Sequence, residues 1–149
     1  MNWTDPSGLL ASYWHYGITY SAAREAGYSV SDSHTIAMAV VNEDRNATDR
    51  SASAANTHAM AGQLFPGGPY QTQIQAIAEA QNIMQNGELS EALHAGEDLP
   101  GHNGESMEQW GWNFPTLLHI QNDLYPSWST MRQAYQNALD ILENEESCE

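Results

Sequence analysis

Apolar residues in most of this chain recur every three or four positions, which is the spacing that places them on one face of a helix. Residues 70–86 show it most clearly, with Ile74, Ile77, Ala78 and Ile83 near one face and Gly87 as the cap. Pro126-Ser127 opens a final helix with a stripe of apolar positions: Met131, Ala134, Tyr135, Ala138, Ile141 and Leu142. We expect the acidic tail over residues 143–149 to fray.

The same spacing predicts other helices, and turn-forming residues separate them. One helix is expected over residues 9–26 with Gly27 as its stop, and the next starts near Ser29 and reaches a polar turn at residues 43–46. Residues 51–57 read as a loop, residues 57–61 as a short apolar piece, and residues 65–69 as a break. Two more helices are expected over residues 89–98 and, opened by Pro115, over residues 116–123. No segment alternates as strands do, so the prediction is an all-α domain of about five to seven helices.

Composition limits the partners of this domain. The 149 residues suit one domain, and the 4 basic against 19 acidic residues give a net charge of −15. This charge repels nucleic acid and anionic membranes unless bound cations reverse it locally. The lone cysteine, Cys148, excludes an intrachain disulfide and a cysteine-based zinc site. No apolar run has membrane-spanning length, so we expect no transmembrane segment.

Histidine and aspartate residues supply the candidate chemistry. His94 and Asp98 are four residues apart, so on a helix they share a face and could hold one ion. We expect Pro100-Gly101 to end that helix and to turn His102 back towards the pair. Imidazole and carboxylate are the ligands of zinc and similar metals where thiolates are absent. The spacing recurs in His119 and Asp123, and the prediction is a metal site.

Taken in order, these residues resemble the ligands of zinc-dependent phospholipase C, whose helical fold the fungal single-strand nucleases share. The ordered set is Trp14-His15, Asp44, His58, His94-x-x-x-Asp98-x-x-x-His102 and His119-x-x-x-Asp123. The chain departs from this family in its shorter length, in its internal Trp14, and in Asp123, where the family has Glu.

The resemblance implies a multi-metal site with two or three zinc ions, or another divalent metal. One zinc takes His58, His94 and Asp98, and a second takes His102, His119 and Asp123, with Asp98 able to bridge the two. His15 would hold a third metal. Asp44 would lie beside the bridging water as ligand or general base, with Asp49 as its possible substitute. The catalytic candidates are therefore Asp44 and Asp98.

A second resemblance concerns the context of the domain. Asp5-Pro6-Ser7-Gly8-Leu9, at the start of the sequence, resembles the end of the core of Rhs/YD-repeat proteins, which a toxic tip domain follows. Residues 15–27 and 92–104 are similar to small bacterial domains found at the ends of such proteins. This implies a linker over residues 1–10 and a toxin domain over residues 11–149. Such a domain is secreted or delivered into a target cell, and its partner is a cognate immunity protein.

The expected function is zinc-dependent phosphoester hydrolysis, most simply of a phospholipid, because the acidic charge disfavours nucleic acid. Two alternatives stay open: a nuclease on the same metal site, and a non-catalytic helical binding module that metal staples together. Glu97 and Glu105 could accept hydrogen bonds from histidine N–H groups or be solvated. Asp32 and His34 fit no part of the pattern and are expected at the surface.

Overall fold

The computed structural model describes residues 12–46, 57–63, 70–103 and 126–146. These ranges contain five helices and one short antiparallel strand pair, which confirms the prediction of a compact all-α domain. In chain order the elements are α1 (Ser12–Glu25), α2 (Val30–Asn46), β1 (Gly62–Gln63), β2 (Tyr70–Gln71), α4 (Gln73–Asn86), α5 (Leu89–His102) and α8 (Trp128–Glu146).

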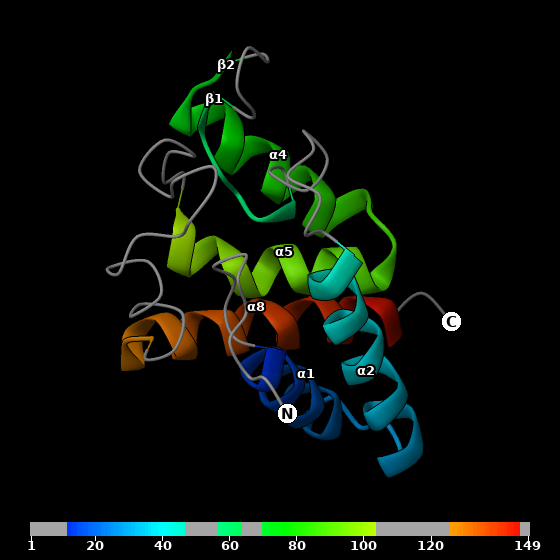
Figure 1. Cartoon of the computed structure of the whole chain (residues 1–149). Coiled ribbons are helices and arrows are strands. Elements are labelled where there is room, and N and C mark those ends of the chain that lie inside the picture. The colour runs from blue at the N-terminus through cyan, green and yellow to red at the C-terminus, as the bar shows by residue number, and fades with distance from the viewer. Residues whose placement is uncertain (1–11, 47–56, 64–69, 104–125, 147–149) are drawn as a thin grey trace.

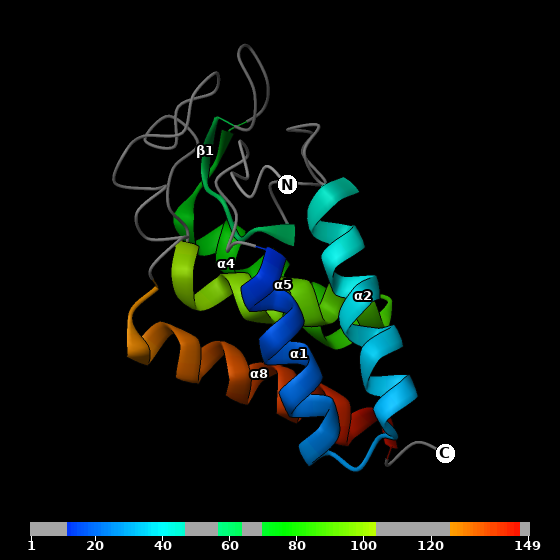
Figure 2. The ribbon, with the colours of Figure 1, turned by 60° about the horizontal axis from the view of Figure 1, so that its bottom comes forward.

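Helix α5 is the centre of the fold. Figures 1 and 2 show it between α4 and α8, with α1 and α2 packed across the same bundle. Of the described helices, each of the other four contacts α5. Residues on the buried side of α5 therefore meet side chains from several distant parts of the sequence.

The apolar core lies where α1, α2, α5 and α8 meet. Four of its nine residues are alanines, which lets the helices approach closely. The predicted stripe of α8 is confirmed at its centre, because Ala134, Ala138 and Leu142 are buried. The helix continues to Glu146, beyond the point where fraying was expected. The core cluster consists of Ile18, Ala22, Ala23, Val40, Leu93, Ala134, Ala138, Leu139 and Leu142.

The ends of α1 and α2 follow from local chemistry. Gly27 has φ 102°, a left-handed conformation, and the N–H of Tyr28 bonds the carbonyl of Ala23 at 3.0 Å, which closes α1 as predicted. At the start of α2, the N–H of Asp32 donates to the side-chain oxygen of Ser29 at 3.1 Å. The polar turn expected over residues 43–46 is wrong, because α2 stays helical through Asn46.

Helix α4 starts later than the pattern indicated. Thr72 and Gln75 form a capping box, so the helix begins at Gln73, and the two residues before Thr72 pair with β1 instead. The predicted apolar face was also partly wrong, since Ile74 is 80% exposed. Ala76 and Ala80 are the residues that α4 buries.

Helix α5 continues through Pro100-Gly101, where the sequence suggested that it ends. The first reason is that Asn103 takes the left-handed conformation and closes the helix there, donating its N–H to the carbonyl of Leu99 at 2.9 Å. The second is a substitute hydrogen bond for the N–H that Pro100 lacks, because Asn137 Nδ2 donates to the carbonyl of Gly96 at 2.7 Å. His102 therefore stays on the helix instead of turning back. Among the described helices, none combines the length and apolar character needed to cross a bilayer.

Candidate metal centre

One continuous helix supplies three of the predicted ligands. His94, Asp98 and His102 follow each other at four-residue intervals on the buried side of α5. The relative exposures of His94 and Asp98 are 0% and 1%, and that of His102 is 6%. The uninterrupted α5 thus presents a row of imidazole, carboxylate and imidazole to the interior.

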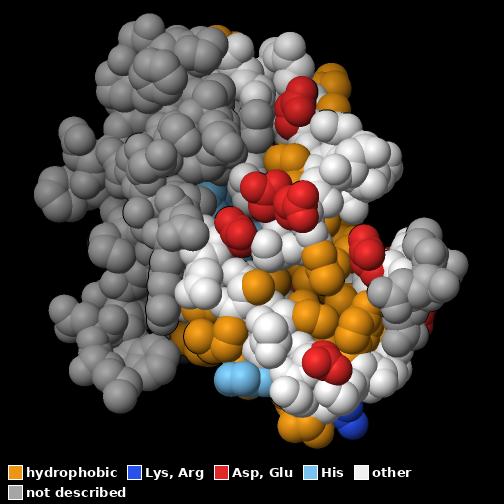
Figure 3. Space-filling model, turned by 90° about the vertical axis from the view of Figure 1, so that its right-hand side faces the viewer, with side chains coloured by type: hydrophobic (Ala, Val, Ile, Leu, Met, Phe, Trp, Pro, Cys, Tyr) orange, Lys and Arg blue, Asp and Glu red, His pale blue; other side chains and the backbone are white. Residues whose placement is uncertain are grey.

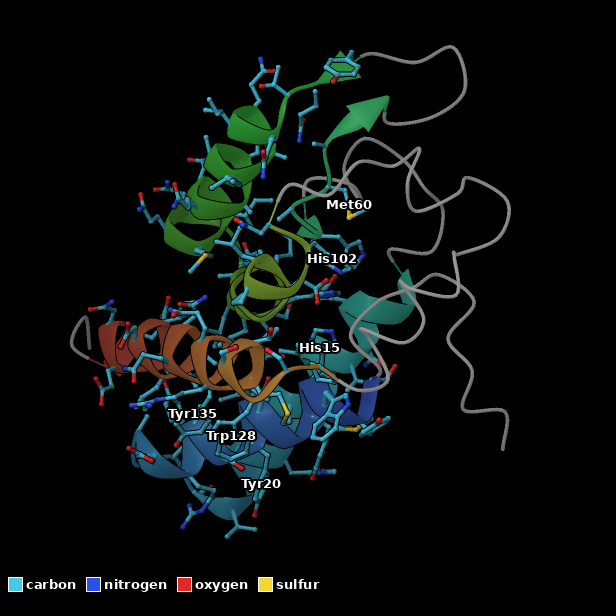
Figure 4. The ribbon with its side chains drawn as sticks, turned by 90° about the vertical axis from the view of Figure 1, so that its left-hand side faces the viewer. His15, Tyr20, Met60, His102, Trp128 and Tyr135 are labelled. Atoms are coloured by element: carbon cyan, nitrogen blue, oxygen red, sulfur yellow. The ribbon has the colours of Figure 1, made fainter. Side chains whose placement is uncertain are left out.

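Asp98 is the point on which the imidazoles converge. Its Oδ1 lies 3.3 Å from Nε2 of His15, and its Oδ2 lies 2.5 Å from Nδ1 of His58. The Oδ2 atom is also 3.2 Å from Nε2 of His94 and 3.9 Å from Nε2 of His102. Figure 4 shows His15 and His102 on the same side of the ribbon, with Met60 above His102. Four histidines from three separate segments therefore surround one carboxylate.

His15 reaches the centre because it lies on the core face of α1. The residues that α1 buries are His15, Ile18, Thr19, Ala22 and Ala23, which are spaced as one helical face. The face of α1 that packs into the apolar core through Ala22 and Ala23 thus also carries the imidazole of His15, nearer the start of the helix. The resemblance to phospholipase C implies a third metal at His15, and in the structure His15 lies directly beside Asp98.

His58 comes from a short buried segment between α2 and β1. His58, Ala59, Met60 and Ala61 are all buried, and Gln71 Nε2 donates to the carbonyl of Met60 at 3.2 Å. Ala59 has φ 53°, a left-handed conformation that is uncommon for alanine. Such local strain persists where the surrounding structure holds the backbone, and Ala59 directly follows the histidine whose Nδ1 contacts Asp98.

Glu97 is buried beside the centre. Its Oε2 lies 2.6 Å from Nδ1 of His15, and its Oε1 accepts a hydrogen bond from the Thr19 hydroxyl at 2.5 Å. Of the two alternatives for Glu97, the solvated surface is wrong, because its exposure is 0%, and its carboxylate lies within hydrogen-bond distance of the His15 imidazole. Thr19 was missed, although it lies four residues after His15 and therefore on the same helix face.

Burial and charge set the protonation of these groups. Burial works against ionisation of Asp98, but attraction from His94 and His15 and hydrogen bonds outweigh it, so its pKa lies well below the usual value. Burial likewise opposes a charge on His15, and Asp98 and Glu97 overcome this and raise its pKa well above 6.5. Burial lowers the pKa of His58 to about 4 and raises that of Glu97. Asp98 is therefore an ionised carboxylate inside the fold.

The donor atoms fit a metal ion. Within the described ranges, four buried atoms of the centre make no hydrogen bond: His15 Nε2, His58 Nε2, His94 Nδ1 and Asp98 Oδ1. Leaving such atoms unsatisfied is costly, and a cation among His15, His94 and Asp98 would give donor atoms of these three residues a partner. His15, His94 and Asp98 each offer one ligand atom, and these atoms lie within 4.8 Å of one another. Imidazole nitrogen with carboxylate oxygen is a donor set typical of zinc and related metals.

Some predicted residues fall outside this description. His119, Asp123, Asp49 and Glu105 lie outside the described residues, and so does the side chain of Asp44, which belongs to the last turn of α2. Asp32 and His34 are exposed as expected, and His34 Nδ1 bonds the hydroxyl of Tyr16 at 2.9 Å. The predicted ligands that the structure brings together are His15, His58, His94, Asp98 and His102.

Comparisons of the chain with protein-family models, with curated proteins and with solved structures found no match.

Proposed function

We propose that this protein is a metal-dependent phosphoester hydrolase whose metal centre is built around Asp98. The observation that carries this proposal is the convergence of four imidazoles on one buried, ionised carboxylate. A buried carboxylate with unsatisfied neighbours is costly for folding alone, and it is typical of a site that holds a cation.

The arrangement around Asp98 supports more than one cation. His15, His94 and Asp98 each offer a ligand atom to one ion, and His58 and His102 lie beside Oδ2 of Asp98, where a second ion could bind. A carboxylate placed in this way can bridge two metal ions. We assign zinc to the site because histidine-rich donor sets favour it over magnesium or calcium. His119 and Asp123 complete the ligand set in this proposal.

Bound zinc would supply an activated water and neutralise charge on the phosphoryl oxygens. The residues of the chain have separate roles. Asp98 fixes the position of the site through α5, His15 and His94 hold its two sides, and Asp44 acts as the general base. Asp44→Asn tests the last role, since it should abolish hydrolysis while zinc stays bound. Hydrolysis at the wild-type rate with zinc bound would remove Asp44 from the mechanism.

A phospholipid with a zwitterionic head group is the substrate we propose. The net charge of −15 disfavours a nucleic-acid track, and Figure 3 shows acidic side chains spread over the face it presents, with a single basic patch at its lower edge. Phosphatidylcholine and phosphatidylethanolamine carry no net charge, so this surface does not repel them as it repels anionic lipids. A nuclease on the same centre is the competing outcome.

The resemblance of residues 5–9 to the end of an Rhs core supports a biological role for such a hydrolase. In this proposal the domain is the toxic tip of an Rhs-type protein that is delivered into a competing cell. A cognate immunity protein would then bind the domain and protect the producing cell. Co-expression with the product of a neighbouring open reading frame, scored by survival, tests this part separately.

The function is tested with purified protein and three substrates: phosphatidylcholine vesicles, plasmid DNA and RNA. We expect zinc-dependent release of phosphocholine from the vesicles, its loss with a chelator, and its loss in Asp98→Asn. Asp32→Asn is the matched control, because Asp32 is an exposed carboxylate away from the centre. Cleavage of only DNA or RNA would replace phospholipase by nuclease, and bound zinc without any hydrolysis would leave a metal-stapled binding module.

A further inference from the structure

Glu97 is a buried carboxylate beside the metal centre that is not among the proposed ligands. It is the residue before Asp98 on α5, and both of its oxygens are already engaged by α1. Oε1 accepts from the Thr19 hydroxyl at 2.5 Å, and Oε2 lies 2.6 Å from Nδ1 of His15. The resemblance to phospholipase C assigns no role to this position.

The two nitrogens of an imidazole point in different directions, so the contact at Nδ1 determines what Nε2 can do. The hydroxyl of Thr19 donates to Oε1 of Glu97. Oε2 lies 2.6 Å from Nδ1 of His15, and in the tautomer with the proton on Nδ1 it accepts that hydrogen. Nε2 of His15 is left on the opposite edge of the ring, 3.3 Å from Oδ1 of Asp98 and without a hydrogen bond among the described residues.

We infer that Glu97, held by Thr19, is a positioning residue that presents Nε2 of His15 to the metal. This inference rests on the proposed metal centre and adds a specific function to a residue outside its ligand set. Carboxylates that accept from the second nitrogen of a metal-binding histidine fix the ring and raise its basicity, and their loss typically weakens metal binding about 10- to 100-fold. Glu97 also joins α1 to α5, so it sets the separation of His15 from Asp98.

Three substitutions separate positioning from simple packing. Glu97→Ala removes the acceptor, Glu97→Gln keeps the size and one carbonyl acceptor, and Thr19→Val keeps the shape but removes the hydroxyl. The matched control is Tyr16→Phe. It removes a hydrogen bond to Nδ1 of His34, an exposed histidine outside the metal centre. Zinc affinity is measured by competition with a chromophoric chelator, and circular dichroism checks the fold of each variant.

We expect zinc affinity to fall about 10- to 100-fold in Glu97→Ala, less in Glu97→Gln, and measurably in Thr19→Val, with no change in Tyr16→Phe. If Glu97→Ala does not fold, the two near-isosteric variants decide the question. Wild-type affinity in folded Glu97→Gln and Thr19→Val would then overturn the inference, as it would in folded Glu97→Ala.

Nitrogen-15 NMR of the His15 ring gives a readout that packing alone does not move. In the zinc-loaded wild type we expect a proton on Nδ1 and metal on Nε2, and the Nδ1–H signal should shift in both Glu97 variants. Metal on Nδ1 of His15 would overturn the inference. A wild type that binds no zinc would overturn the proposed function as well, whereas zinc binding that is insensitive to Glu97 would overturn this inference alone.

Discussion

The side chain of Asn137 on α8 donates to the backbone carbonyl of Gly96 on α5, across 2.7 Å. In an unbroken helix this carbonyl would accept from the residue four positions later, which is Pro100 and has no N–H. Asn137 therefore replaces the missing hydrogen bond from a neighbouring helix. As a result α5 continues to His102, and His94, Asp98 and His102 stay in one row.

Asn137→Ala should destabilise the protein by about 1 to 2 kcal/mol, because the Gly96 carbonyl would lose its partner in a partly buried position. In a Pro100→Ala background the backbone N–H returns, so the same substitution should cost less. Chemical denaturation of the four proteins in this cycle measures the difference. Gln136→Ala, which removes an exposed hydrogen bond to Asp140, is the control on the same helix. Equal costs in both backgrounds would contradict this account of α5.

Gly96 is also where α5 approaches α8 closely. A Cβ atom there would lie 3.1 Å from Cδ1 of Ile141 and 3.4 Å from Cβ of Asn137. Gly96→Ala should therefore destabilise by about 1 to 3 kcal/mol, and Ile141→Val should recover part of the loss. Gly17→Ala is the matched control, since nothing lies within 4 Å of its Cβ and alanine favours the helix. Thermal unfolding measures the change in stability. A stabilising Gly96→Ala would contradict this prediction, because it would mean that α5 and α8 can move apart without loss of stability.

The low pKa of His58 predicts an acid-sensitive metal-free protein. Burial holds the folded pKa at about 4 against 6.5, so between these values the unfolded state binds a proton that the folded state does not. Stability should fall as the pH drops through this window, by about 3 kcal/mol in total. The raised pKa of His15 does not contribute, because His15 is protonated in both states there. Glu97, whose pKa is raised, acts in the opposite direction.

Denaturation of chelator-treated protein at several pH values checks this prediction through the difference between the wild type and His58→Asn. The variant lacks the titrating imidazole, so its stability should depend less on pH in this window, and Glu97 acts on both proteins alike. His34→Asn, at an exposed histidine, should keep the wild-type slope. Parallel slopes in wild type and His58→Asn would mean that His58 does not carry the effect.

Metal should stabilise the fold, because its ligands come from α1, α5 and the segment before β1. Zinc at about 100 times its dissociation constant would add about 2.7 kcal/mol to the wild type. His94→Asn should lose most of this gain, and its unfolding in the presence of chelator should resemble that of the wild type. Calorimetric scans with and without zinc measure both quantities. A wild-type transition that zinc does not move would contradict the metal centre.

Much of the fold followed from sequence, because α1 and α8 bury regular apolar stripes and Gly27 and Ser29 carry local capping signals. The end of α5 did not follow. Pro100 is a helix breaker by local chemistry, and the residue that compensates for it, Asn137, lies on a helix far along the chain. The predicted start of α4 was also wrong, since the capping box at Thr72 begins the helix at Gln73 and the two residues before Thr72 pair with β1.

The candidate site could also be predicted only where local spacing along one helix determines it. The four-residue spacing of His94, Asp98 and His102 is visible in the sequence, and helix geometry alone aligns them. Nothing local says that His15 and His58 meet Asp98, because that depends on how α1 and the segment before β1 pack on α5. The role of Glu97 needed the structure, since its neighbours Thr19 and His15 are about eighty positions away.

Anomalous X-ray diffraction at the zinc edge, on crystals grown with zinc, tests the central claim most directly. Our account predicts an anomalous peak within about 2.0 to 2.2 Å of His15 Nε2 and a carboxylate oxygen of Asp98, with His94 as a further ligand. The same crystals of Asp98→Asn should lose the peak. Zinc bound elsewhere on the protein, with these three side chains bonded only to one another, would contradict the account.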